Sequence, residues 1–178
     1  MKIAVFFPGI GYHCDKPLLY YGAKIAGQYQ YEVCKIPYAD LSRSMEEAFR
    51  QAFAQTEEYL AQVDWHQYEE ILFISKSIGT VVAAAYAQKY SINCRNVYYT
   101  PVKQTFDFTP HSGIVFHGTD DSWVDTPTVR EKCQENDLPL HVIEGADHSL
   151  EVKGDAQRTI GILQDVMKLT QAYIADRI

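Results

Sequence analysis

The strongest constraint on the fold is the regular alternation, along the chain, of short apolar runs with longer segments of helical periodicity. Six of these runs are rich in β-forming residues, and they cover residues 3–7, 31–36, 70–75, 96–100, 113–117 and 140–143. Several are apolar without interruption, which is typical of strands covered on both faces. Because alternating strands and helices form parallel sheets with right-handed crossovers, the pattern predicts an α/β protein with helices on both faces of a parallel sheet.

Helical periodicity fills the intervals between the runs, over residues 18–28, 42–63, 78–90, 127–136 and 155–177. The second segment opens with a capping-box pattern in which Ser42 or Ser44 is the N-cap. The third segment is rich in alanine, which predicts a central helix packed closely on the sheet. The fourth predicts Thr126 as its N-cap, with Pro127 at the first helical position.

The length of 178 residues fits one domain over residues 1–178 and is too short for two ordinary domains. The longest segment without helical periodicity, residues 101–112, leaves no room for a lid domain. Hydrophobic residues make up 47% of the chain and charged residues 22%, and this ordinary globular composition argues against disorder.

Charge and apolar content exclude several classes of partner. Lys and Arg minus Asp and Glu give 16 − 23 = −7, so the chain would approach nucleic acid or an anionic membrane against its own field. No apolar run approaches the roughly 18 residues of a membrane span. The opening apolar run is too short for a secretory signal, and the four cysteines form no C-x-x-C pair. We therefore expect a cytoplasmic protein with reduced thiols that binds neither nucleic acid nor membrane.

The residues that follow the predicted strands are the candidates for function, because ligands bind beyond the carboxyl ends of parallel strands. Ser77 follows the third run, and His148 follows the sixth. Asp120 and Asp121 follow the fifth run, and a glycine-containing turn at residues 8–11 follows the first. The pattern therefore brings a serine, an acid and a histidine to one edge of the sheet.

The turns that carry these residues resemble three motifs of the α/β-hydrolase superfamily. The sequence S-K-S-I-G at residues 75–79 resembles the nucleophile elbow G-x-S-x-G, with Ser75 in place of the first glycine. The sequence H-G-T-D-D-S-W-V at residues 117–124 resembles the H-G-x-x-D-x-x-V turn of the acid, and residues 145–150 resemble the G-x-x-H turn of the histidine. Together with the turn at residues 8–11, these motifs most resemble the small, lidless members that are similar to dienelactone hydrolase.

The resemblance implies a minimal α/β-hydrolase fold with six parallel strands, flanking helices and no lid domain. The implied strand order is 2-1-3-4-5-6, which would place the turn at residues 8–11 beside Ser77. It also implies a serine hydrolase that cleaves a small ester or thioester through an acyl-enzyme. Ser77 would attack, His148 would take its proton, and Asp121 would orient the imidazole, because a serine hydroxyl needs an adjacent base. Asp120 is the alternative acid.

Backbone N–H groups are expected to form the oxyanion hole: that of Ile78, at the start of a helix, and that of Ile10 or Gly11. Four further side chains near these turns each allow two interpretations. Tyr12 and Trp123 either line the pocket or pack in the core or at its rim. His13 either packs or contacts the substrate. Lys76, in the variable position of the elbow, lies either at the mouth of the pocket or exposed to solvent.

Two other functions stay open: a catalytically silent binding or scaffold protein that keeps the fold, and an acyltransferase, which shares the acyl-enzyme. The expected partner is a small-molecule substrate, and the chain is expected to be a monomer or a homodimer. The proposed chemistry needs no cofactor. We also expect no metal site, because metal-ligand spacing such as H-x-x-x-H is missing from His66, His111, His117 and His141.

Overall fold

The computed structural model describes residues 1–110 and 112–176. Over these residues, six strands form one sheet in the order β2-β1-β3-β4-β5-β6, and every neighbouring pair is parallel. The strands are β1 (Lys2–Phe7), β2 (Glu32–Lys35), β3 (Glu70–Lys76), β4 (Arg95–Tyr99), β5 (Gly113–Gly118) and β6 (Leu140–Ile143). The predicted fold class and the implied strand order are confirmed.

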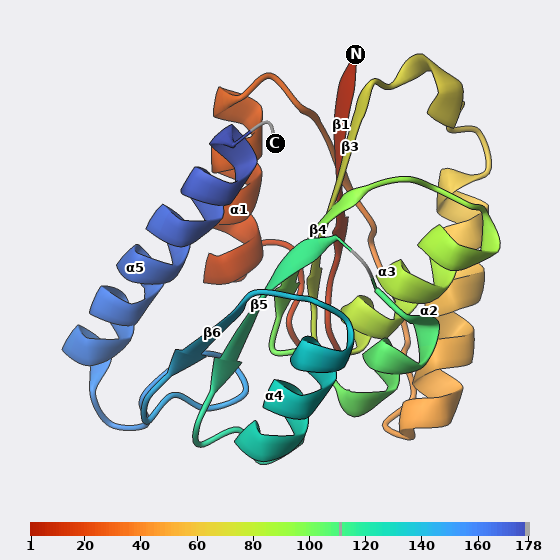
Figure 1. Ribbon diagram of the computed structural model, residues 1–178. Helices are drawn as coiled ribbons and strands as arrows, with labels where there is room; N and C mark the ends of the chain where they lie inside the picture. The colour runs from red at the N-terminus through yellow and green to blue at the C-terminus, as the bar shows by residue number, and fades with distance from the viewer. Residues whose placement is uncertain (111, 177–178) are drawn as a thin grey trace.

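Helices cover both faces of the sheet, so the molecule has three layers (Figure 1). One face carries α1 (Pro17–Gln28) and α5 (Ala156–Ala175), and the other carries α2 (Met45–Leu60), α3 (Ile78–Lys89) and α4 (Thr126–Glu135). Short 3₁₀ helices lie before β3, at η1 (Trp65–Gln67), and after β4, at η2 (Lys103–Phe108). In Figure 1, β1 begins and α5 ends at the same end of the molecule, beside the amino-terminal edge of the sheet.

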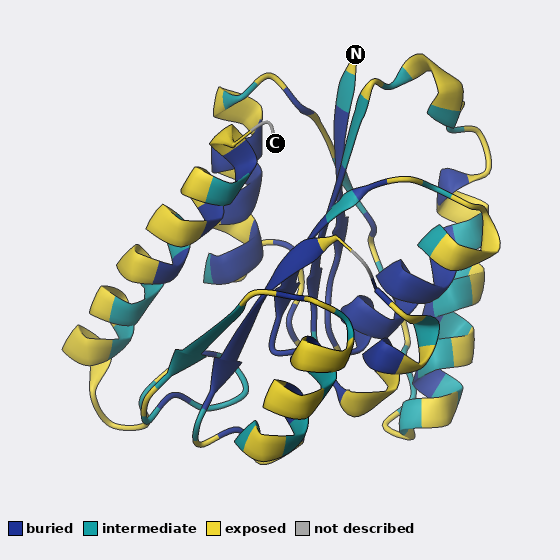
Figure 2. Cartoon of the chain, viewed as in Figure 1, coloured by how far each residue is buried: buried dark blue, intermediate teal, exposed yellow. Residues whose placement is uncertain are grey.

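Alternate residues of the central strands feed two separate cores, which explains why the runs are apolar without interruption. In β1, Ala4 and Phe6 pack with residues of α1 and α5, whereas Val5 and Phe7 pack with residues of α2 and α3. In Figure 2 the central strands β1, β3, β4 and β5 are mostly buried, β6 is half-buried, and the helices are buried on their inner sides and exposed on their outer sides. The site at the edge of the sheet therefore stands on strands that are fixed from both sides.

Two helices begin differently from the prediction. α2 begins at Met45 rather than at residue 42, with Ser44, one of the two predicted candidates, at the N-cap position. The Ser44 side chain accepts no hydrogen bond from the described helix amides, and Ser42 Oγ accepts from the N–H of Ser44 at 3.1 Å. The N-cap of α4 is Asp125 rather than Thr126, because the Asp125 carboxylate accepts from the N–H of Thr128 at 2.9 Å. A charged carboxylate is the stronger acceptor of the two side chains, so the helix starts one residue earlier.

Over the described residues, the connections between strands hold α1, α2 with η1, α3, η2 and α4, and none of them contains an inserted lid domain. The segment without helical periodicity after β4 contains η2. The last helix is described to Ala175, and its predicted end at Arg177 lies outside the described residues. Within the part of the chain that the structure describes, none of the helices combines the length and apolar character needed to cross a bilayer.

Candidate active site

Ser77 lies in the tight turn between β3 and α3, at the carboxyl edge of the sheet. Its φ of +55° and ψ of −124° are strained for a residue with a side chain, at a cost of about 1–3 kcal/mol. The N–H of Ser77 donates to the carbonyl of Tyr99 on the neighbouring strand at 3.1 Å. Gly79 is required two residues later, because a Cβ there would lie 2.1 Å from the carbonyl oxygen of Phe7. The surrounding strands thus hold the serine hydroxyl at this edge.

A continuous chain of hydrogen bonds joins the three side chains that the sequence motifs single out. Ser77 Oγ lies 2.8 Å from Nε2 of His148, and Nδ1 of His148 lies 2.7 Å from Oδ2 of Asp121. An imidazole that donates its Nδ1–H to a carboxylate leaves Nε2 free to accept from a hydroxyl. The three groups come from the loops after β3, β5 and β6 and form the relay that a serine nucleophile requires.

Asp121, and not Asp120, is the carboxylate bonded to the histidine. Oδ1 of Asp121 accepts from the N–H of Trp123 at 2.8 Å while Oδ2 faces His148. Burial raises the pKa of Asp121, but the hydrogen bonds from His148 and from the N–H of Trp123 outweigh it and hold the pKa below its ordinary value. The carboxylate is therefore ionised at neutral pH. Asp120 is exposed and accepts from the hydroxyl of Thr119 at 3.5 Å.

The loop that carries His148 is braced by groups that the motifs did not identify. The carboxylate of Asp147 accepts from the N–H groups of Ser149 at 2.7 Å and Glu151 at 3.1 Å. The hydroxyl of Thr100 donates to the carbonyl of His148 at 2.9 Å. Aspartate side chains commonly accept from the backbone N–H two residues later, so the role of Asp147 was accessible from the sequence, whereas that of Thr100 depends on packing between distant loops.

Burial lowers the pKa of His148, and the neighbouring charge of Lys76 lowers it further, against the opposing effect of Asp121. The imidazole is consequently neutral at neutral pH, the state in which it can accept a proton.

The turn after β1 lies directly against the serine. It is closed by two hydrogen bonds between Gly9 and Tyr12, at 3.1 and 3.2 Å. A Cβ on Gly9 would lie 3.0 Å from the Cβ of Ser77, and Gly11 has a φ of +68°. Glycine is needed at both positions, for close approach at one and for a left-handed turn at the other.

The residues predicted to form the oxyanion hole are near the serine in two ways: Ile78 follows it in the chain, and Ile10 and Gly11 belong to the turn whose Gly9 packs against it. Among the described residues, no acceptor is bonded to the N–H groups of Ile78, Ile10 and Gly11. The N–H of Ile78 stands at the first position of α3, where the partial positive charge of the helix end adds to its dipole. Ile10 and Gly11 are exposed in the turn, whereas Ile78 is buried beneath the site.

A cavity of about 680 Å³ opens beside this turn, between the loops after β1 and β2. Its lining includes Ile10, Gly11, His13, Lys35, Pro37 and Tyr38. His13 is exposed, so it borders the cavity and does not pack in the core. Cys14 also lines the cavity, and burial raises the pKa of its thiol to about 12, which keeps it protonated. The cavity is large enough for a small molecule, and it borders the turn after β1, but its lining does not include Ser77 or His148.

Both sequence interpretations of Lys76 are wrong. Its side chain is only 1% exposed, so it lies neither at the mouth of a pocket nor in solvent. Its ammonium stands 5.1 Å from the ring centre of Tyr12. Tyr12 is itself buried, and its hydroxyl accepts from the N–H of Leu18 at 3.1 Å, so it packs in the core. Strand alternation gives the reason: Lys76 follows Leu72 and Ile74 on the same face of β3.

Trp123 lies at the rim of the site. It is 58% exposed, and its ring centre is 5.5 Å from that of His148, with the planes tilted by 33°. An exposed indole in this place covers the outer side of the imidazole.

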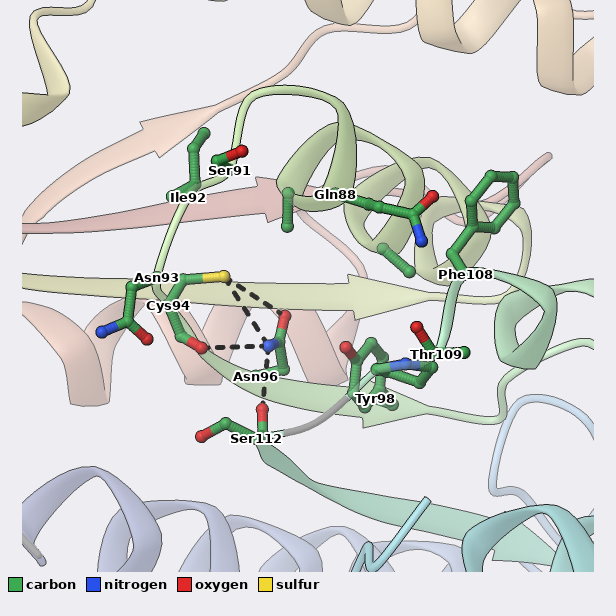
Figure 3. A pocket seen from close by; sticks show the side chains of 13 residues that line it. Gln88, Ser91, Ile92, Asn93, Cys94, Asn96, Tyr98, Phe108, Thr109 and Ser112 are labelled. Atoms are coloured by element: carbon green, nitrogen blue, oxygen red, sulfur yellow. Dashed lines mark hydrogen bonds between the residues drawn. The ribbon is translucent and has the colours of Figure 1, made fainter. Parts of the chain in front are cut away.

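A second cavity, of about 290 Å³, lies at the opposite edge of the sheet, near the start of β4 (Figure 3). Its polar groups bond to one another: the Asn96 amide donates to the carbonyls of Ser112 at 2.8 Å and Cys94 at 3.3 Å. Burial raises the pKa of the Cys94 thiol to about 12. The hydrogen-bonded relay of serine, histidine and aspartate therefore marks the carboxyl edge of the sheet, and not this cavity, as the candidate active site.

Within residues 1–110 and 112–176, no group of three or more His, Cys, Asp or Glu side chains could hold a metal ion. One of the histidines considered in the sequence, His111, lies outside the described residues. Nδ1 of His117 lies 3.8 Å from Oδ2 of Asp121, and its Nε2 lies 3.1 Å from Oγ1 of Thr126. His117 therefore packs against the turn that carries Asp121.

The sequence matches no protein-family profile and no curated protein. The fold is similar to that of an α/β serine hydrolase homologue from Coxiella burnetii, with a TM-score of 0.72 and 16% identity over 98% of this chain and 85% of the other. An α/β serine hydrolase without a lid from Xanthomonas campestris has a TM-score of 0.69 and 15% identity over 97% and 80%. An esterase from Pyrococcus furiosus has a TM-score of 0.71 and 13% identity over 97% and 82%. This chain therefore has the α/β-hydrolase fold.

Proposed function

We propose that this protein is a serine hydrolase that cleaves a small ester or thioester through an acyl-enzyme. The observation that carries the proposal is the hydrogen-bonded relay from Ser77 through His148 to Asp121, with links of 2.8 and 2.7 Å. Each group has the ionisation state that the reaction needs, because the acid is charged and the imidazole is neutral.

In the first half of the reaction, Ser77 Oγ forms a bond to the carbonyl carbon of the substrate as Nε2 of His148 takes the hydroxyl proton. Asp121 stabilises the imidazolium that results. The N–H of Ile78 and that of Ile10 or Gly11 donate to the developing oxyanion, and one such donor is typically worth about 3–4 kcal/mol. The bond to the leaving alcohol or thiol then breaks, and the imidazolium returns its proton to that group.

Water completes the cycle. His148 takes a proton from the water, whose oxygen bonds to the acyl carbon, and the bond to Ser77 Oγ breaks as the proton passes back to the serine. The products are an acid and an alcohol or thiol. The cavity of about 680 Å³ beside the turn at residues 9–12 supports a small substrate.

The test uses a short p-nitrophenyl ester and a fluorophosphonate probe on the wild-type protein and on Ser77→Ala. We expect turnover and covalent labelling in the wild type and neither in Ser77→Ala. The matched control is Ser75→Ala in the same elbow, whose buried Oγ donates to the carbonyl of Val97 at 3.3 Å and should leave labelling intact. Labelling that persists in Ser77→Ala would overturn the proposal.

A further inference from the structure

Lys76 is an unusual residue to find directly before the candidate nucleophile, because its charged end is inside the protein. Its side chain is 1% exposed and points, like Leu72 and Ile74, into the layer of α1 and α5. In the described structure, the Lys76 ammonium takes part in neither a hydrogen bond nor an ion pair. A buried cation without such partners is costly, so its presence calls for a role.

The groups around the ammonium belong to the candidate site. Tyr12, from the turn after β1, offers its ring face at 5.1 Å, an arrangement that stabilises a cation. The loop that carries His148 packs in the same core as Tyr12, through Ala146 and Leu150, so it lies on the face of the sheet into which Lys76 points. Asp121 and Asp147 act on the ammonium as negative charges, and the charge of the ammonium acts on His148. The lysine is therefore coupled to the acid, the base and the loop that carries the base.

The charge of Lys76 opposes protonation of His148. Burial lowers the pKa of Lys76 to about 7, from an ordinary value of 10.5, while Asp121 and Asp147 act in the opposite direction. On the acid side of pH 7 the lysine is thus charged, which is the range in which an ordinary histidine gains its proton. A positive charge held at this place disfavours the imidazolium in the resting protein.

We propose that Lys76 is a positioning residue that acts through His148: its buried ammonium keeps the imidazole neutral and extends hydrolysis to lower pH. The role rests on the proposed function, since it concerns the base of the same relay. Tyr12 holds the ammonium in place, and the burial that makes the cation costly also leaves its field unscreened by water. A lysine that served only to fill space would have no effect on the protonation of the histidine.

The first measurement is the pH dependence of kcat/KM for the wild-type protein and for Lys76→Met, which keeps the length of the side chain and removes its charge. The acid limb should move to higher pH in Lys76→Met. One pH unit below the wild-type midpoint, the variant should retain about threefold less of its own plateau activity, corresponding to a half-unit displacement. Lys76→Gln, a second neutral variant, should behave in the same way, and Lys76→Arg should keep the wild-type limb.

The matched control is Lys168→Met, the same change of charge at an exposed position on α5, which should leave the limb in place. The second measurement follows the His148 imidazole by nuclear magnetic resonance during a pH titration, without substrate. Its midpoint should rise in Lys76→Met and Lys76→Gln.

The two measurements separate the two proposals. A raised imidazole midpoint in a protein without esterase activity supports the charge coupling and contradicts the proposed function. An active protein whose imidazole midpoint and acid limb are the same in the wild type and both neutral variants overturns the role of Lys76 and leaves the proposed function intact.

Discussion

At the scale of single residues, the most informative comparison is between two adjacent aspartates with different surroundings. Asp121 is buried and bonded to His148 and to the N–H of Trp123, whereas Asp120 is exposed. The carboxylate can only accept from Nδ1, so it fixes the tautomer of the imidazole. An amide in the same place could donate to Nδ1 and would then favour the other tautomer.

We therefore predict that Asp121→Asn lowers kcat/KM for a short ester on the order of 10⁴-fold while the fold is kept. Asp120→Asn is the control, and its kcat/KM should stay within about threefold of the wild type. A large loss in Asp120→Asn together with a small loss in Asp121→Asn would show that the acid has been assigned to the wrong residue.

Lys76 also makes a prediction about stability. Its pKa is about 7 in the folded protein and has an ordinary value of 10.5, so between these values the unfolded chain binds more protons than the folded one. Stability rises with pH wherever the unfolded state binds more protons, so the contribution of Lys76 to the free energy of unfolding rises from about pH 7 to 10.5. Below that window the full penalty of burying the cation is present.

Urea unfolding of the wild type and Lys76→Met across this pH range checks the sign. Lys76→Met should be the more stable protein near pH 7, and its advantage should shrink as the pH rises. A difference that stays constant with pH would mean that the ammonium is not desolvated in the folded protein.

At the scale of elements, the sequence predicted the strands well because each central strand is covered on both faces and must be apolar throughout. Helix starts were less accessible, because both serines before α2 and both Asp125 and Thr126 before α4 are good cap residues, and local geometry chooses between them. Lys76 was misjudged because its charge suggested solvent, although its place in the alternation of β3 indicated the interior. The cavity beside the turn at residues 9–12 depends on how the loops after β1 and β2 pack, which no local pattern encodes.

Close approach between elements gives a further prediction, at Gly118. A Cβ there would lie 2.1 Å from the carbonyl oxygen of Ala146, in the loop that carries His148. We expect Gly118→Ala to lower the free energy of unfolding by more than about 2 kcal/mol, since backbone on both sides must move, and to lower esterase activity as the histidine shifts. Urea unfolding and kcat/KM measure the two effects.

Gly161 in α5 is the matched control, because an added Cβ there meets no described atom within 4 Å. Gly161→Ala should raise stability by about 0.5–1 kcal/mol and leave activity unchanged, as expected for alanine in a helix. Equal losses in the two variants would argue against the tight contact at Gly118.

At the scale of the whole molecule, the two cores share the same strands. The layer of α1 and α5 and the layer of α2, α3 and α4 pack on opposite faces of one sheet, so loss of either layer would expose an apolar face of the strands that support the other layer (Figure 2). Sharing of this kind favours cooperative unfolding of the two layers.

Trp123→Phe makes this testable, because it leaves Trp65 as the remaining tryptophan, packed against Phe73 and Tyr86 on the α2 and α3 side. Tryptophan fluorescence then reports one layer, while far-ultraviolet circular dichroism reports the helices of both. We expect the two urea transitions to coincide within about 0.2 M. A fluorescence transition clearly separated from the helical one would show that the layers unfold independently.

The direction in which the strands run has a practical consequence. The relay lies where the parallel strands finish, whereas β1 begins and α5 ends at the other end of the molecule (Figure 1). A linker joined to either of those elements will leave the protein on the side away from Ser77. The protein can therefore be tethered to a bead or fused to a carrier through that side, with the edge of the sheet that carries Ser77 still facing the surrounding solution.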